Sequence, residues 1–402
     1  TGDTMGMAQT VSAWVRTSSS APDLGRDAAE AVRAANTFPG QIATLILPAD
    51  ASWGEGGAVA APIAASPPAP VDGNAIEGAA RMLRDNRDVL ILLAGHGVLS
   101  EAQKLAWRVA SATGASLMAS YVNSQVARGR GNLQLERVPY VMDNAIKALD
   151  QYKHIILVNA QPPVGFFGYP GMPSVQHHPQ AQFHVLSRPD QDPVEALRAL
   201  VKELHAPEVA MPDPGPRPEL ESGAPSPEGL ARTLAALMPE NSIVSDESIS
   251  YGRGFYQFTH AAPAHDWLHL AGGAIGDGMP VATGAAIGAR RERRVINLQA
   301  DGSAMYSLQS LWTQARERLP VTTVILNNSK YNILIGEYKN VGATPGSKAM
   351  SMLDLGNPGI SWVQLANGMG VEAARATTME QCADLMRASF GKPGPFVIEL
   401  MI

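Results

Sequence analysis

Cysteine is almost absent from this chain, and charged residues are few. Cys382 is the only cysteine among 402 residues, which excludes a disulfide framework and fits a reducing compartment such as the cytoplasm. Its place in a helical pattern predicts a packed thiol rather than a nucleophile. Charged residues make up 17% of the chain and hydrophobic residues 45%, a balance that suits a well-buried fold of two or three domains.

Blocks of basic residues and long apolar runs are missing as well. The net charge is -6 without a basic cluster, so nothing in the composition indicates a nucleic-acid partner. The longest apolar runs, residues 89–93 and 154–158, are far too short to cross a bilayer, so no membrane partner is expected. No basic segment leads into an apolar one at the N-terminus, so no secretory signal is visible. Because the first residue is Thr1 rather than methionine, we expect the chain to begin inside a longer protein.

The most informative feature present is an aspartate and an asparagine at the ends of two successive predicted strands. Asp301 follows the apolar run 294–298, and Asn328 follows the run 321–326. The carboxyl ends of parallel strands meet at one edge of an open α/β sheet, where ligands bind. A carboxylate, an amide oxygen and a nearby backbone carbonyl form an all-oxygen set that Mg²⁺ prefers, usually with phosphates of a ligand. The next residues, Gly302-Ser303, open a helix whose free N–H groups favour a phosphate.

This segment resembles the motif of thiamine diphosphate-dependent enzymes, in which GDG is followed at a set distance by NN. Here the motif reads Ala300-Asp301-Gly302 and Asn327-Asn328, so an alanine replaces the first glycine and its methyl group can crowd the diphosphate loop. The chain is most similar to acetolactate synthase large subunits and benzoylformate decarboxylases. The resemblance covers most of the chain and is strongest from about residue 241 to the end.

The resemblance implies roles for further residues around the diphosphate. The backbone carbonyl of Lys330 falls in the register of the third protein ligand to the metal. Ser250 falls where a hydroxyl meets the diphosphate; a helix N-cap is the simpler alternative, and both roles can hold. The backbone N–H groups of Tyr331 and Asn332 correspond to groups that face the diphosphate in the family.

A glycine-rich loop, residues 272–280, is the second distinctive segment. Glycines let a backbone approach a ligand closely, and the resemblance places Gly273 and Ala274 beside the cofactor. In the family a bulky apolar residue of this loop props the cofactor into a bent shape, and Ile275 matches that position. The alternative is a plain turn whose isoleucine belongs to the core. The GxGxxG fingerprint is not matched, which argues against a nicotinamide enzyme.

Strands that alternate with helices predict an α/β fold with doubly wound parallel sheets. We expect residues 1–65 to be the remnant of a pyrimidine-binding domain, residues 74–205 a Rossmann-like middle domain and residues 227–402 the thiamine diphosphate-binding domain. Residues 206–226 are rich in proline and predict an extended linker. The expected helices are residues 26–36, 74–84, 100–113, 227–238, 362–369 and 379–389. The expected strands are residues 42–47, 89–93, 116–119, 154–158, 243–244, 294–298, 321–326 and 395–401.

The middle region offers weaker signals. His96 lies at a glycine-flanked strand end where some relatives bind a flavin or a nucleotide, so FAD is a further candidate cofactor, although an empty middle domain is the default. Phe166, Phe167 and Tyr169 stand where benzoylformate decarboxylases carry a catalytic histidine; they are either pocket walls or core residues. The histidine pair 177–178 is not expected to share a metal, because adjacent side chains point apart in an extended chain.

The resemblance implies a thiamine diphosphate- and Mg²⁺-dependent lyase or carboligase acting on small 2-keto acids, similar to acetolactate synthase. A simple 2-keto acid decarboxylase is the alternative. The family's activating glutamate lies upstream of the position of Thr1, so no catalytic residue is assigned and the chain by itself is expected to be inactive. The family's site lies between two subunits, which implies a homodimer or homotetramer. Two other hypotheses stay open: a non-catalytic thiamine diphosphate-binding protein, and a phosphate-binding α/β protein unrelated to thiamine.

Overall fold

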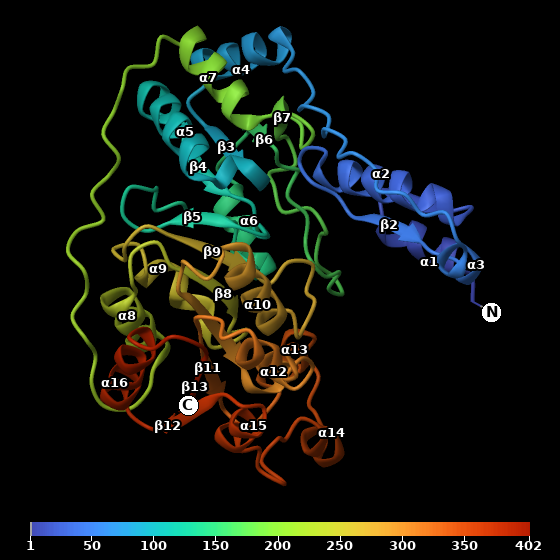
Figure 1. Cartoon of the computed structure of the whole chain (residues 1–402). Helices are drawn as coiled ribbons and strands as arrows, with labels where there is room; N and C mark the ends of the chain where they lie inside the picture. The colour runs from blue at the N-terminus through green and yellow to red at the C-terminus, as the bar shows by residue number, and fades with distance from the viewer. Residues whose placement is uncertain (1) are drawn as a thin grey trace.

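The computed structural model describes residues 2–402, which build three sheets in chain order (Figure 1). The first sheet pairs two short parallel strands and projects to one side of the molecule. Its elements are α1 (Thr4–Val11), β1 (Trp14–Thr17), α2 (Leu24–Asn36), β2 (Ala43–Ile46) and α3 (Ala49–Trp53). Helix α2 and strand β2 form where the sequence predicts a helix and a strand.

The second sheet has four parallel strands in the order β4-β3-β6-β7. Its elements are α4 (Gly73–Asp85), β3 (Val89–Leu93), α5 (Ser100–Thr113), β4 (Ser116–Ala119), α6 (Met142–Leu149), β6 (His154–Val158), β7 (Gln182–Ser187) and α7 (Pro193–Glu203). Helix α4 starts one residue before the predicted range of 74–84. The carboxylate of Asp72 accepts the N–H of Asn74 at 2.9 Å, so the aspartate is the N-cap.

The third sheet has seven strands in the order β12-β13-β11-β10-β8-β9-β5. Its strands are β5 (Val126–Arg128), β8 (Ile243–Glu247), β9 (His265–His269), β10 (Val295–Ala300), β11 (Val321–Asn327), β12 (Glu372–Ala376) and β13 (Phe396–Met401). The helices that follow its strands are α8 (Pro227–Leu237), α9 (Phe255–Phe258), α10 (Gly278–Gly288), α11 (Asp301–Ala304), α12 (Ser310–Arg316), α13 (Asn332–Asn340), α14 (Ser347–Met352), α15 (Trp362–Gly368) and α16 (Met379–Phe390).

Helices cover both faces of the third sheet, which is why its central strand β11 is buried along its whole length. In β11, Val324 and Leu326 pack on the side of α8 and α16, whereas Ile325 packs on the side of α12 and α15. The predicted doubly wound α/β fold is confirmed. Cys382 of α16 is fully buried in the first of these clusters, and burial raises the pKa of its thiol to about 12, as expected of a packed cysteine.

Strand β5 departs from the predicted arrangement. It lies within residues 74–205, yet it pairs antiparallel with β9 at the edge of the third sheet, with Arg128 opposite His265. The third sheet is therefore mixed rather than wholly parallel. Three residues give no periodic pattern, and only the tertiary pairing makes this segment a strand.

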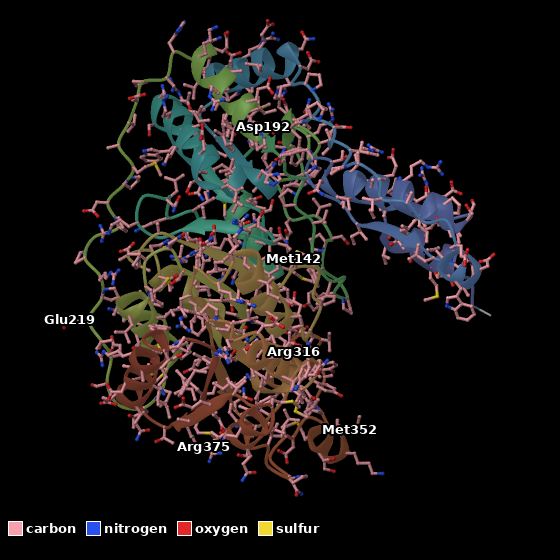
Figure 2. All side chains as sticks on the ribbon, in the orientation of Figure 1. Met142, Asp192, Glu219, Arg316, Met352 and Arg375 are labelled. Carbon is pink, nitrogen blue, oxygen red and sulfur yellow. The ribbon has the colours of Figure 1, made fainter. Side chains whose placement is uncertain are left out.

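An extended segment connects the second sheet to the third. Residues 206–226 contain no helix or strand and run along the outside of the molecule from α7 to α8; Glu219 marks them in Figure 2. Among residues 2–402, no helix has both the length and the apolar character needed to cross a membrane.

The strand order places a topological switch between β8 and β10. Strand β8 is followed in sequence by β9 on one side, while β10 lies on its other side. The chain after β8 leads to α9 on one face of the sheet, and the chain after β10 leads to α12 on the opposite face. Open α/β sheets bind ligands in the crevice at the carboxyl ends of such strands.

Candidate functional site

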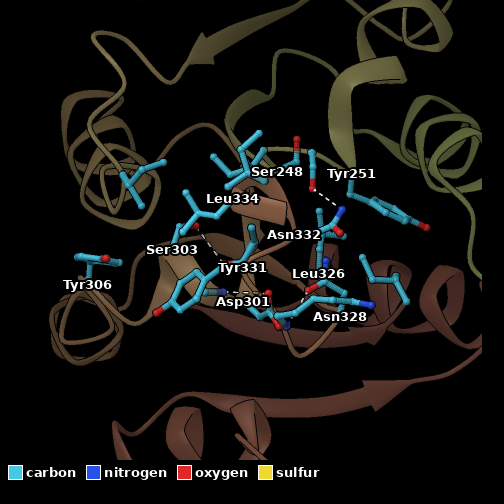
Figure 3. A pocket seen from close by; sticks show the side chains of 18 residues that line it. Ser248, Tyr251, Asp301, Ser303, Tyr306, Leu326, Asn328, Tyr331, Asn332 and Leu334 are labelled. Carbon is cyan, nitrogen blue, oxygen red and sulfur yellow. Dashed lines mark hydrogen bonds between the residues drawn. The ribbon is translucent and has the colours of Figure 1, made fainter. Parts of the chain in front are cut away.

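A cavity of about 200 Å³ opens at this switch point, at the carboxyl ends of β8, β10 and β11 (Figure 3). The residues predicted from sequence that line it are Ser250, Ile275, Asp301, Gly302, Ser303, Asn328, Lys330, Tyr331 and Asn332. Tyr306 and Leu334, for which the sequence predicts no role, also line it. The structure therefore brings together all three predicted metal ligands and most of the predicted cofactor-binding residues.

Asp301 is the only carboxylate among the residues that line the cavity, and it is 2% exposed. Its Oδ1 accepts the N–H of Gly302 at 2.9 Å, and its Oδ2 accepts the N–H of Ser329 at 2.7 Å. The second bond joins the end of β10 to the loop after β11, so the segments that carry Asp301 and Asn328 are in contact. Burial raises the pKa of Asp301 above its ordinary value, although backbone N–H donors such as those of Gly302 and Ser329 partly offset the desolvation of the carboxylate.

The loop after β11 adds neutral oxygens to this carboxylate. Asn328 Oδ1 accepts the N–H of Lys330 at 3.0 Å, and the carbonyl of Lys330 accepts the N–H of Asn332 at 3.0 Å. Each oxygen keeps a second lone pair. Among residues 2–402, no group of three His, Cys, Asp or Glu side chains is arranged to hold a metal ion. One carboxylate with neutral oxygens fits Mg²⁺ that shares its coordination with phosphates.

The glycine that this turn requires is the second glycine of the family motif, not the first. A Cβ on Gly302 would lie 2.6 Å from Cε1 of the Tyr331 ring and 3.3 Å from Cδ1 of Leu355. Ala300 instead has extended backbone angles, φ -69° and ψ 143°, which any residue adopts. The alanine that replaces the first glycine therefore causes no backbone strain.

We predict that Gly302→Ala weakens binding of thiamine diphosphate by tenfold or more, because the added methyl pushes the Tyr331 ring or the turn into the cavity. Isothermal titration calorimetry with Mg²⁺ present measures the change. The matched control is Gly336→Ala on α13, where a Cβ meets nothing within 4 Å. The control should bind normally and gain about 0.5–1 kcal/mol in helix stability. Equal affinity of the Gly302→Ala variant and the control would contradict the prediction.

The predicted phosphate-facing groups are partly engaged within the protein. Ser250 Oγ accepts a long hydrogen bond from Asn332 Nδ2 at 3.4 Å and caps no helix (Figure 3). The N–H of Tyr331 donates to the carbonyl of Leu353 at 2.9 Å, and that of Asn332 donates to the carbonyl of Lys330. Both backbone groups would have to leave these bonds to hold a diphosphate, so their role stays a prediction.

Ile275 projects from the β9–α10 loop at the cavity. It is 43% exposed, so the alternative of a core isoleucine is wrong. Gly273 and Ala274 belong to the same loop but do not line the cavity. Gly273 has a φ of 68° in the left-handed region, and a Cβ there would lie 3.0 Å from the ring of Phe166.

Two buried polar residues behind the cavity have no role predicted from the sequence. Glu247 at the end of β8 and Gln299 in β10 are both 0% exposed. Gln299 Nε2 donates to Glu247 Oε2 at 2.8 Å and to Ser303 Oγ at 2.7 Å. Polar side chains that interrupt otherwise apolar strands are the signal that could have identified them.

The aromatic segment of the second unit lies against this site. Phe166 and Phe167 are 43% and 51% exposed, so they are not core residues, and the Phe166 ring reaches Gly273. Tyr169 donates its hydroxyl to Glu337 Oε2 on α13 at 3.0 Å. These contacts with the cavity's loop and helix favour the pocket-wall alternative.

The remaining candidate histidines, at positions 96, 177 and 178, contact other protein groups. The His96 ring packs 4.8 Å from the ring of Phe38, and nothing at this strand end adds support for FAD, which stays a prediction. His177 Nδ1 lies 3.0 Å from the carbonyl of His178, while His178 Nδ1 accepts the N–H of Gln180. Each ring is thus engaged with its own loop.

An α/β fold with a carboxylate, neutral oxygens and a glycine turn at its switch point defines a protein built to hold a phosphorylated ligand. Comparisons make this class specific. Residues 250–400 match the model of the thiamine pyrophosphate enzyme C-terminal TPP binding domain. The chain is 44% identical over 399 residues to IlvX of Mycobacterium tuberculosis, which is named as an acetolactate synthase large subunit; the match covers 98% of this chain and 76% of that protein.

One further relative and one solved structure of the same fold extend the comparison. Benzoylformate decarboxylase of Pseudomonas aeruginosa is 31% identical over 207 residues, which cover 51% of this chain and 38% of that protein. The structure of the thiamine diphosphate-dependent 4-hydroxybenzoylformate decarboxylase of Rhodococcus jostii has a TM-score of 0.80 at 23% identity and covers 99% of this chain and 77% of that one. The chain belongs to the family of thiamine pyrophosphate-dependent enzymes. The hypothesis of a phosphate-binding protein unrelated to thiamine is therefore wrong.

Proposed function

We propose that the protein is a thiamine diphosphate- and Mg²⁺-dependent carboligase or lyase that acts on 2-keto acids, similar to acetolactate synthase. The observation that carries the proposal is the contact between the Asp301 carboxylate and the loop of Asn328 inside one cavity, together with Ile275. The relationship to IlvX supports the acetolactate synthase-like assignment.

Each segment of the cavity has a distinct task in this proposal. Asp301, the Asn328 amide oxygen and the Lys330 carbonyl would hold Mg²⁺ beside the diphosphate. Ser250 would offer its hydroxyl and Ser303 its backbone N–H to the phosphate oxygens, while Ile275 would orient the middle of the cofactor. When bound, thiamine diphosphate supplies the carbanion chemistry that removes CO2 from a 2-keto acid.

Product analysis tests this function. We expect the protein in its complete natural form, supplied with thiamine diphosphate, Mg²⁺ and pyruvate, to release CO2 and form acetolactate. Omission of Mg²⁺ should abolish both products. Cofactor binding without turnover of any 2-keto acid would favour a non-catalytic role and contradict the proposal.

A decarboxylase of aromatic 2-keto acids is the second candidate, and one observation favours it. The exposed rings of Phe166 and Phe167 lie beside the Ile275 loop, where they offer an apolar wall to an aromatic substrate. Benzoylformate would then yield benzaldehyde faster than pyruvate yields acetolactate. Phe166→Ala should lower the rate with benzoylformate about tenfold and leave the pyruvate rate unchanged, if the ring contacts the aryl group.

The proposal extends to the assembly and the compartment. We infer a homodimer or homotetramer in the cytoplasm, in line with the family's intersubunit site and the single buried thiol. Sedimentation at micromolar concentration tests the assembly, and a monomer that turns over a 2-keto acid would contradict it.

A further inference from the structure

Glu247 is a buried carboxylate whose hydrogen-bond partners all belong to segments that form the cavity. It is 0% exposed at the end of β8. Its Oε1 accepts the N–H of Gly276 at 2.5 Å, and its Oε2 accepts the N–H of Gly278 at 2.7 Å. The same Oε2 accepts Nε2 of Gln299 at 2.8 Å. Among residues 2–402 it has no ion-pair partner, so these N–H donors alone stabilise the charge.

The two backbone donors flank Asp277, and the first of them lies next to the predicted cofactor prop. Gly276 comes directly after Ile275, and its φ of 98° lies in the left-handed region. A Cβ on Gly276 would lie 2.6 Å from Cβ of Tyr306, and one on Gly278 would lie 2.8 Å from Cβ of Glu247. The loop is therefore pressed between the Tyr306 side chain, labelled in Figure 3, and the buried carboxylate. Its position depends on both sides.

Gln299 extends the same network to the phosphate end of the cavity. Its Nε2 donates to Glu247 and also to Ser303 Oγ, which donates in turn to the carbonyl of Ala300. Ser303 thus keeps a local hydrogen bond that does not depend on Glu247. Removal of the Glu247 charge therefore disturbs the Ile275 loop more than it disturbs the turn at Asp301.

Asp277, the residue between the two donors, adds electrostatic repulsion to the buried Glu247 carboxylate. Its half-buried carboxylate lies near Glu247, and burial followed by repulsion from Glu247 raises the pKa of Asp277 to about 6. The hydrogen bonds from the N–H groups of Gly276 and Gly278 to Glu247 offset the free-energy cost of burying two neighbouring carboxylates. Packing alone would not require a charged side chain at position 247.

We propose that Glu247 is a positioning residue that fixes the height of Ile275 in the cavity and thereby shapes the site for the body of thiamine diphosphate rather than for its phosphates. The inference rests on the proposed function. Glu247 touches neither the cofactor nor the substrate in this role. It acts through the backbone of Gly276 and Gly278.

Two ligands separate this role from general structural support: thiamine diphosphate and inorganic pyrophosphate, each titrated calorimetrically with Mg²⁺. Glu247→Gln keeps the shape but turns an amide NH2 toward an N–H donor, so the loop shifts. We expect it to weaken thiamine diphosphate binding tenfold or more and pyrophosphate binding less than twofold. Ile275→Ala should do the same. The double variant should be no weaker than the weaker single variant, because both act through one contact.

A second variant and a control guard against misfolding. Gly276→Ala displaces the loop from the Tyr306 side, leaves the carboxylate in place and should reproduce the selective loss. Asp27→Asn removes another buried carboxylate, in the first unit, and should change neither affinity. Equal weakening of both ligands by Glu247→Gln, or multiplying losses in the double variant, would overturn the inference. Failure of the unaltered protein to bind thiamine diphosphate with Mg²⁺ would instead sink the proposed function, and this inference with it.

Discussion

Asp301→Asn should abolish the Mg²⁺-dependent binding of thiamine diphosphate while leaving the protein folded. The asparagine has the same shape and still accepts one of the two N–H bonds from Gly302 and Ser329. The substitution also removes a buried charge that has no cationic partner among residues 2–402, so the free energy of unfolding without ligand should change by no more than about 1 kcal/mol. Without the carboxylate, only neutral oxygens remain for the metal, and affinity for Mg²⁺ should fall at least a hundredfold.

Urea unfolding with and without ligand measures this effect directly. A ligand present at a hundred times its dissociation constant stabilises the native state by about 2.7 kcal/mol. The unaltered protein should show this gain with thiamine diphosphate and Mg²⁺ together, and the Asp301→Asn variant should show none. Asp384→Asn, on the exposed face of α16 where Asp384 pairs only with Arg387, is the matched control and should retain the full gain. If the Asp301→Asn variant kept this gain in stability, Asp301 would not be a ligand of the metal.

The local pattern of the sequence predicted that Asp301 and Asn328 lie at one edge of the sheet, for a physical reason. Asp301 and Asn328 each follow an apolar strand, and adjacent parallel strands place their carboxyl ends at one edge whatever else the chain does. Strands β10 and β11 were predictable on the same basis, since both are buried on both faces. The metal-binding role of these residues stays a prediction.

The features that tertiary contacts create were not predictable. Strand β5 has three residues and exists only because β9 pairs with it. Glu247 gave no signal of its partners, because the donors Gly276 and Gly278 lie about thirty positions away in a loop. The sequence could not decide whether Phe166 and Phe167 are core residues or pocket walls, because it does not give their exposure. In each case the missing information was which segments meet.

The pairing of β5 with β9 also buries a group of basic side chains. His265, Trp267 and His269 alternate along β9, and Arg128 of β5 is 1% exposed beside them, with its guanidinium carbon 3.3 Å from the centre of the Tyr256 ring. Arg128 Nη2 donates to Thr259 Oγ1 at 2.8 Å, and no carboxylate forms an ion pair with it among residues 2–402. A further positive charge in this cluster is therefore unfavourable.

The histidines of this cluster are held neutral. Burial, and then the charge of Arg128, lowers the pKa of His265 to about 4. Burial, and then Arg137 and Arg128, lowers the pKa of His269 well below its ordinary value. His265 Nδ1 lies 2.7 Å from the carbonyl of Pro263, and His269 Nδ1 lies 3.1 Å from Arg137 Nη1. His269 Nδ1 can accept a hydrogen bond from Arg137 only while that nitrogen is unprotonated.

Acid should therefore destabilise the protein through this cluster as the pH falls below about 6.5. Both histidines have a native pKa below the unfolded value of about 6.5, so the unfolded chain binds more protons as the pH falls below that value. The stability that the neutral rings contribute is complete above pH 6.5 and is lost down to about pH 4, where His265 protonates in the native state. His260, whose pKa burial lowers to about 3, adds a third such proton, while Asp277, whose pKa is raised to about 6, offsets about one. The net two protons cost about 3 kcal/mol per pH unit, or roughly 4 kcal/mol between pH 6.5 and pH 5.

Urea unfolding at several pH values between 7.5 and 5 measures this slope. His269→Phe should remove about one proton from it, because an aromatic ring of similar size fills the site without titrating. His205→Asn is the matched control: His205 is exposed at a φ of 51°, which asparagine tolerates, so the slope should stay unchanged. An unfolding free energy that is constant from pH 7.5 to pH 5 would mean that the cluster accepts protons without cost. Arg128 and Arg137 would then need a negative charge beside the protonated histidines, and no carboxylate of residues 2–402 forms an ion pair with either arginine.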